Sequence, residues 1–202
     1  MVGLLLFMII TLFLIHRLGE ILGMRVGFMQ EHRQNFFGDS ENSESEIEET
    51  TPSSLDTKLA EIRRIYPKFE KSDFINKARA AFEIIFTSYA KGDLRSLKGL
   101  VSARVFEAFS MAIEDRKSRD ETLEGSIERF ISAEIIDADL SEESIFVTMK
   151  FVTEQSNILR DKNGKIIEGT EDFLENRTDI WTFFRKKFAT DNKWFLYELK
   201  QD

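Results

Sequence analysis

The apolar residues of this chain change their spacing near Gly125, and this change constrains the fold more than any other feature. Upstream, residues 72–90 place Phe, Ile and Ala at every third or fourth position, which is typical of one face of a helix. Downstream, residues 145–152 place Ile, Val, Met and Phe at every second position, which is typical of a strand. Helices followed by antiparallel strands predict an α+β domain whose helices pack on one face of a curved sheet.

Capping residues set the expected helix limits. Pro67 ends the first helix because it disfavours helical geometry in the residue before it. Ser72 or Asp73 is the expected N-cap of the second helix, and Gly92 is its left-handed stop. Asp93 is the expected N-cap of a short third helix. The helices are predicted at 55–66, 72–90, 93–101 and 102–119.

The strand region alternates in four segments. In the first of them, the apolar residues Ile131, Ala133 and Ile135 occupy every second position. Asn163 and Gly164 form a strong turn signal because both residues tolerate positive φ. The predicted strands are 131–135, 145–152, 178–187 and 193–200.

The first fifteen residues carry no charge, and His16 and Arg17 follow them directly. Such a run is a cleaved signal peptide, a retained anchor or a buried core helix. No basic residue precedes the run and no small-residue cleavage site follows it, so the sequence favours an uncleaved transmembrane anchor over 1–16. Its length of about 22 Å is short of a bilayer core, and snorkelling by the basic flank closes the gap. The Lys/Arg bias predicts a single-pass topology with the C-terminal domain in the cytoplasm.

Residues 17–38 mix Arg with Leu, Ile, Met and Phe, a composition suited to the headgroup layer of a membrane. Arg17, Arg25 and Arg33 are therefore the candidate lipid-binding residues, and anionic lipid is the expected ligand.

Residues 39–54 are acidic, rich in Ser and Thr and nearly free of apolar side chains. Such a segment cannot bury enough surface to offset its chain entropy, so it is predicted to be a disordered linker. Residues 55–202 remain as one folded domain, and nineteen Phe residues give the chain ample material for its core.

The composition excludes several kinds of chemistry from that domain. The chain has no Cys, and its two histidines, His16 and His32, precede the domain. Catalytic triads and His- or Cys-based metal sites therefore cannot form in it. No P-loop or dinucleotide fingerprint is present, and no cofactor is expected. Seven acidic residues and no basic one lie within 39–56, which leaves the rest near neutrality and argues against nucleic-acid binding.

Carboxylates on or near the predicted strands are the remaining candidates for catalysis. One of them inside an apolar cavity would be a general base with a raised pKa. The favoured interpretation is that they face solvent or form cross-strand ion pairs, and Arg185 is likewise expected on the surface. The six carboxylates are Asp137, Asp139, Glu154, Glu168, Asp179 and Glu198.

Several segments resemble the Tim44-like domain family, in particular AKGDLRSLKGLVS, AIEDRKS and the pair WTFFRK and KWFLYEL. The anchor followed by HRLGEILGMRVG is similar to the bacterial, membrane-anchored members. The resemblance implies an NTF2-like cone with an apolar pocket, preceded by one transmembrane helix in a bacterial inner membrane. It also implies interaction rather than catalysis, with translocase or chaperone components as partners. The basic helix near 55–71 would either contact lipid or pack on its own domain.

Three hypotheses for function follow. The leading one is a membrane-tethered protein-interaction or scaffolding module, related to protein translocation or membrane-protein assembly, that is not an enzyme. The second is an NTF2-like isomerase or dehydratase with a buried Asp or Glu near a Tyr or Asn. The third is a subunit of an envelope secretion apparatus, against which the basic flank after the anchor argues.

Overall fold

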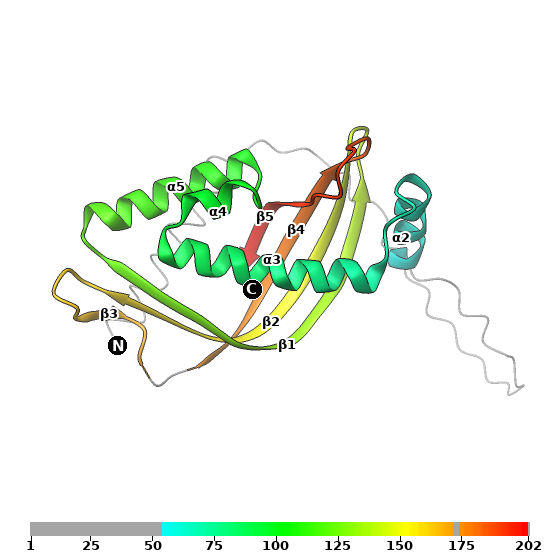
Figure 1. The fold of residues 1–202 in the computed structure, drawn as a ribbon. Helices are drawn as coiled ribbons and strands as arrows, with labels where there is room; N and C mark the ends of the chain where they lie inside the picture. Colours follow the sequence, from blue (N-terminus) through cyan, green and yellow to red (C-terminus); the bar gives the residue numbers. More distant parts are fainter. Residues whose placement is uncertain (1–53, 172–173, 202) are drawn as a thin grey trace, which may run out of the picture. The chain divides into compact units, whose positions relative to one another are not determined.

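A strongly bent antiparallel sheet forms the centre of the folded part (Figure 1). The computed structural model describes residues 54–171 and 174–201, which lie in one compact unit, Pro52–Asp202. The strands run in the order β1-β2-β4-β5, with the short β3 paired to β2, and all neighbours are antiparallel. The predicted α+β class is therefore confirmed. The strands are β1 (Thr122–Leu140), β2 (Ser144–Arg160), β3 (Ile166–Glu168), β4 (Glu175–Lys186) and β5 (Phe195–Gln201).

In the described part of the chain, four helices precede the sheet, and most of their ends follow the predicted caps. Gly92 ends the second with φ 68°, and the Asp93 carboxylate accepts hydrogen bonds from two backbone N–H groups of the next. The N-cap of the second helix differs from the prediction, because the Glu70 carboxylate accepts both the Asp73 N–H and the Ser72 hydroxyl. The helices are α2 (Ser54–Ile65), α3 (Lys71–Lys91), α4 (Leu94–Lys98) and α5 (Ala103–Ser118).

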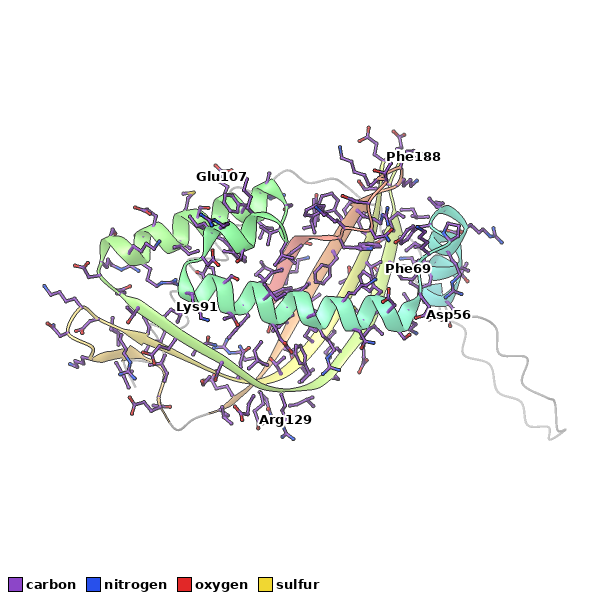
Figure 2. The ribbon with its side chains drawn as sticks, in the orientation of Figure 1. Asp56, Phe69, Lys91, Glu107, Arg129 and Phe188 are labelled. Atoms are coloured by element: carbon purple, nitrogen blue, oxygen red, sulfur yellow. The ribbon has the colours of Figure 1, made fainter. Side chains whose placement is uncertain are left out.

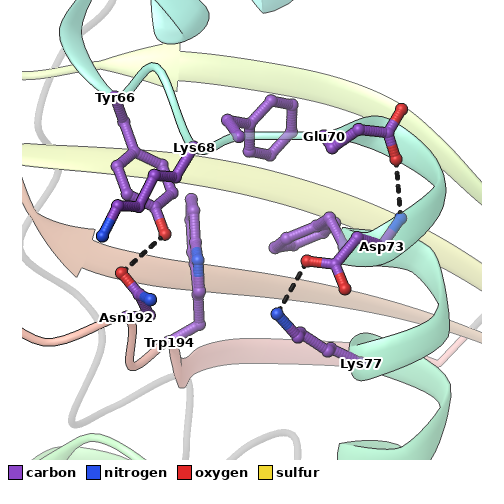
Figure 3. Close-up of a pocket in the computed structure, with 9 residues that line it drawn as sticks. Tyr66, Lys68, Glu70, Asp73, Lys77, Asn192 and Trp194 are labelled. Carbon is purple, nitrogen blue, oxygen red and sulfur yellow. Dashed lines mark hydrogen bonds and ion pairs between the residues drawn. The ribbon is translucent and has the colours of Figure 1, made fainter.

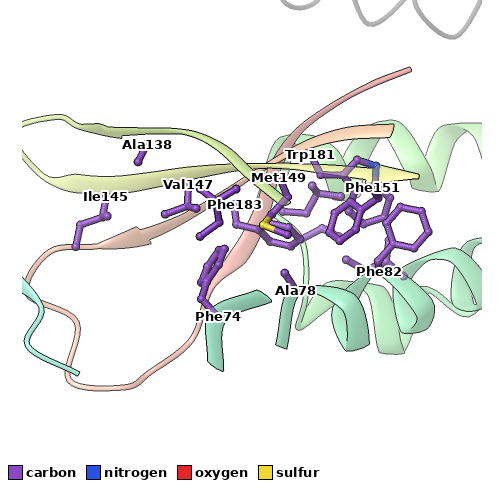
Figure 4. Close-up of a cluster of buried hydrophobic side chains, with 14 of the residues drawn as sticks. Phe74, Ala78, Phe82, Ala138, Ile145, Val147, Met149, Phe151, Trp181 and Phe183 are labelled. Carbon is purple, nitrogen blue, oxygen red and sulfur yellow. The ribbon is translucent and has the colours of Figure 1, made fainter. Parts of the chain in front are cut away.

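The core lies between α3 and the inner face of the sheet (Figure 4). On α3, Phe74 and Phe82 point toward the strands, where they meet Phe183 and Trp181 of β4. The alternation predicted for β2 is confirmed, because every second side chain from Ile145 to Thr153 is 0% exposed. These fully buried β2 residues are Ile145, Val147, Met149, Phe151 and Thr153.

β1 departs from simple alternation because three register shifts interrupt its pairing with β2. One shift lies between Phe130 and Ser132, so Ile131 turns outward and is 48% exposed. Ile131 therefore does not share the burial of Ile135, although the alternation predicted for this segment would place both on one face. Gly125 was predicted to precede the strand, yet it lies within β1. A Cβ atom at Gly125 would come within 2.9 Å of the Phe86 ring, so glycine is required for α3 to pack there.

The open edge of β1 is protected against pairing with other chains. The bulges twist the strand, and Lys58 of α2 forms ion pairs with carboxylates near the end of β1. The Lys58 Nζ lies 2.7 Å from Asp137 Oδ1 and 3.1 Å from Asp139 Oδ1. Charges, bulges and a covering helix are the usual means by which edge strands avoid aggregation.

Candidate functional site

Aromatic rings fill the inner face of the sheet beside α3. The Phe82 ring centroid lies 4.3 Å from Trp181, 4.7 Å from Phe151 and 5.6 Å from Phe130. The family resemblance implied an apolar pocket inside the cone, and these rings occupy that space. This part of the inner face is therefore packed core.

Polar side chains follow the aromatic rings along the same face of β2 and β4. Thr153 and Gln155 are buried, and the Thr153 hydroxyl donates to Gln155 Oε1 at 3.3 Å. On β4, Arg177 lies opposite Thr153, and its Nε is 3.1 Å from Glu175 Oε2. Asp179 lies opposite Phe151 and alternates with Trp181, so it shares the inner face. We call Thr153, Gln155, Arg177 and Asp179 the polar end of the inner face.

Asp179 is the carboxylate whose environment most resembles that of a general base. Burial raises its pKa to about 6, and the nearby Arg177 guanidinium opposes that shift. No hydrogen bond from a tyrosine or asparagine contributes to the shift, although an NTF2-like catalytic site was predicted to need one. Asp179 therefore meets one of the two requirements of the enzyme hypothesis, and within the described residues the second is not met.

We expect Asp179 to make the domain less stable as the pH rises from about 4 to about 6. In that window the folded protein retains a proton that the unfolded chain, with its ordinary pKa of 3.8, has released. The loss amounts to at most about 3 kcal/mol of unfolding free energy, and Asp179→Asn should remove it. Urea unfolding of the full chain between pH 4 and pH 8 measures the slope. Glu107→Gln on the exposed side of α5 is the matched control, and an unchanged slope in Asp179→Asn would contradict the prediction.

Four other candidate carboxylates form ion pairs, and one of these pairs crosses between strands as the favoured interpretation expected. Besides the two partners of Lys58, Glu154 pairs across the strands with Arg129 at 2.8 Å. Glu198 lies 3.6 Å from Lys200. Burial raises the pKa of Glu168 on β3, and the Arg177 charge lowers it. In the described ranges, no three His, Asp or Glu side chains converge as metal ligands would.

Arg185 was expected on the surface, and the structure places it in the interior with 2% of its surface exposed. It occupies the same face of β4 as Trp181 and Phe183. Its guanidinium carbon lies 3.8 Å from the centroid of the Tyr66 ring. Its Nη2 donates to the Ala189 carbonyl at 3.1 Å and to another backbone carbonyl of the β4–β5 loop. Arg185 therefore fixes that loop against the end of α2.

A small hollow lies beside this contact, between the α2–α3 connection and the β4–β5 loop (Figure 3). The Tyr66 hydroxyl donates to Asn192 Oδ1 at 3.0 Å across its rim, and Trp194 forms one wall. Its volume of about 20 Å³ holds about one water molecule, too little for an organic ligand.

The basic helix near 55–71 packs on its own domain. In α2, Leu59 and Ile62 are 5% and 0% exposed and belong to the core. Arg63 and Arg64 remain exposed. Leu59 and Ile62 are therefore not available to a membrane, and the exposed residues of α2 are mostly polar or charged, apart from Ala60 and Ile65, which is 39% exposed.

The predicted membrane elements cannot be compared with the structure. The anchor over 1–16, the lipid-binding candidates Arg17, Arg25 and Arg33, and both histidines lie outside the described residues. Within 54–171 and 174–201, no helix has the length and apolar character that a bilayer span requires.

Comparisons with known proteins identify the family. The profile described as "Tim44-like domain" matches residues 55–201, so this chain belongs to the Tim44-like domain family. A stretch of 121 residues is 23% identical to mitochondrial import inner membrane translocase subunit TIM44-1 of Arabidopsis thaliana, covering 60% of this chain and 26% of that protein. A stretch of 139 residues is 27% identical to an uncharacterized protein, RP434, of Rickettsia prowazekii (strain Madrid E), covering 69% of this chain and 56% of that protein. The chain thus spans about a quarter and about half of these relatives.

Solved structures show a coarser likeness. The intermembrane space region of chloroplast protein ARC6 has a TM-score of 0.47 at 11% identity, covering 67% of this chain and 98% of that one. A member of the NTF2-like family from Streptomyces avermitilis has a TM-score of 0.34 at 11% identity, covering 64% and 96%. At such scores neither likeness supports an argument about function.

Proposed function

We propose that this chain is a membrane-tethered protein-interaction module of a bacterial inner membrane, with its folded domain in the cytoplasm. The observation that carries the proposal is the Tim44-like match over 55–201, since a matched relative is named as a subunit of an import translocase. The uncharged run over 1–16 and the acidic segment over 39–54 supply an anchor and a tether. The module acts on proteins that cross or enter that membrane.

The surface of the domain supports this role better than its interior. The inner face is largely packed with aromatic rings, whereas the outer face carries a cluster of half-exposed aromatic side chains. Their ring centroids lie 5.2–6.2 Å apart. Exposed aromatic groups are enriched where proteins bind one another. The outer cluster consists of Phe146, Phe184, Phe195 and Tyr197.

Crosslinking of the full chain in intact membranes, followed by mass spectrometry, tests the proposal. We expect crosslinks from the domain to inner-membrane proteins of the translocation or assembly machinery. A reporter enzyme fused to the C-terminus tests the topology independently. Crosslinks to soluble enzymes of one metabolic route, or a reporter active only outside the cytoplasm, would count against this function and favour the enzyme or the secretion-apparatus hypothesis.

We expect Arg17, Arg25 and Arg33 to bind anionic lipid. Each contributes about 1 kcal/mol near an anionic leaflet, so changing all three to Gln should weaken binding by about 100-fold. Sedimentation with vesicles of phosphatidylcholine and phosphatidylglycerol measures this for a chain that lacks residues 1–16. Binding should fall as salt is added. The matched control changes Arg63 and Arg64 to Gln, and an equal loss in that control would refute the assignment.

A further inference from the structure

Phe188, in the β4–β5 loop (187–194), is the most exposed large apolar side chain of the described residues. It is 88% exposed, whereas the next such residues, Ile84 and Ile131, reach 48%. Figure 2 shows it at the tip of the connection between β4 and β5. A phenylalanine in this position contributes nothing to the core, and its burial against another surface would be favourable.

Hydrogen bonds to its backbone hold the loop that carries Phe188. Arg185 Nη2 donates to the carbonyls of Ala189 at 3.1 Å and Asp191 at 2.9 Å, one and three residues after Phe188. The Lys187 N–H before it donates to the Glu143 carbonyl at 2.8 Å. The backbone is therefore fixed on both sides of Phe188. An aromatic side chain on a fixed backbone loses little entropy on binding, which is the property of interface anchors.

Charges of opposite sign flank Phe188. The Lys187–Glu143 hydrogen bond brings the β1–β2 turn (141–143) beside the loop. That turn carries Glu142 and Glu143, whereas Lys186 ends β4 and Lys187 begins the loop. These four charges cancel, so an anionic bilayer would attract one side of Phe188 and repel the other. A protein surface can present a charge of the right sign to each side.

We propose that Phe188 inserts into an apolar pocket of a protein partner. The pocket has carboxylates on the side that faces Lys186 and Lys187, and a Lys or Arg on the side that faces Glu142 and Glu143. This inference rests on the proposed function, because it names one surface, in addition to the outer cluster, through which the domain binds its protein partner.

The test places a photoreactive group at the tip of the loop in the full chain, in the membranes of the cells that make it. The change Phe188→p-benzoylphenylalanine keeps an aromatic side chain that is already exposed, so folding should be preserved. Illumination should give one discrete adduct with a protein other than this chain. Its yield should fall about tenfold in Lys186→Glu/Lys187→Glu and also in Glu142→Lys/Glu143→Lys, because each pair of changes opposes one side of the pocket.

Controls separate the proposal from its alternatives. The same photoreactive group at Ile84 on α3, also exposed, should not give that adduct. Unchanged thermal unfolding shows that the charge variants are folded. Binding to phosphatidylcholine–phosphatidylglycerol vesicles, measured alongside, should not depend on Phe188.

Adducts with lipid, with a second copy of this chain or with no molecule would overturn the proposal. A yield that falls with the lysine changes and rises with the glutamate changes would overturn it too, because that pattern is expected of an anionic bilayer. If the domain still crosslinks to inner-membrane proteins from other positions, only this surface is wrong. If no position crosslinks to such a protein, the proposed function fails as well.

Discussion

Changing Phe82 to alanine should lower the free energy of unfolding by about 3–5 kcal/mol, the largest effect expected in this domain. Phe82 is 1% exposed and lies at the centre of the aromatic packing between α3 and the sheet. Its removal takes a ring away from Trp181, Phe151 and Phe130 together. These neighbours lie on three strands and cannot all move inward, so a cavity remains and adds to the loss.

Urea unfolding of the full chain, followed by tryptophan fluorescence, measures this loss. The chain has two tryptophans, and both belong to or pack against the core, so the signal reports on the domain. Phe188→Ala is the matched control, since the same truncation at an 88% exposed side chain should change stability by less than about 0.5 kcal/mol. Equal effects at the two positions would mean that α3 does not pack on the sheet as described.

The sequence predicted most of the secondary structure because local signals decide it. The left-handed stop at Gly92 and the N-cap at Asp93 depend on one or two residues and their own backbone. The inward face of β2 follows from alternation alone. The bulge that turns Ile131 outward depends on pairing with a strand twenty residues away, and no local pattern announces it.

Whether a charged residue is exposed or buried was harder to predict from the sequence. Arg185 was assigned to the surface by its charge, although it continues the alternation of Trp181 and Phe183. The two-residue alternation of the strand, rather than the residue type, predicts the buried position of Arg185. Asp179 has the same signal, and it was among the candidates. Phe188 falls between the predicted strands 178–187 and 193–200, so its position in a turn indicates exposure, whereas its residue type favours burial.

Changing Arg185 to alanine should lower the free energy of unfolding by about 2–4 kcal/mol. Two loop carbonyls, those of Ala189 and Asp191, would lose their donor, and the Tyr66 ring would lose the cation beneath it. The vacated volume adds a cavity. Arg185→Met fills that volume but supplies no hydrogen-bond donors, so it should lower the free energy of unfolding by about half as much. The comparison of the two variants separates the contribution of packing from that of hydrogen bonding.

The loop should respond more strongly than the rest of the domain. Hydrogen exchange of amides in 187–194 should become faster in Arg185→Met, while exchange in the centre of β2 stays near that of the unchanged chain. Lys186→Ala is the matched control, because this neighbour is exposed and should change stability by less than about 0.5 kcal/mol. Unchanged exchange in the loop of Arg185→Met would show that the guanidinium does not hold it. The rigid presentation of Phe188 would then lose its physical basis.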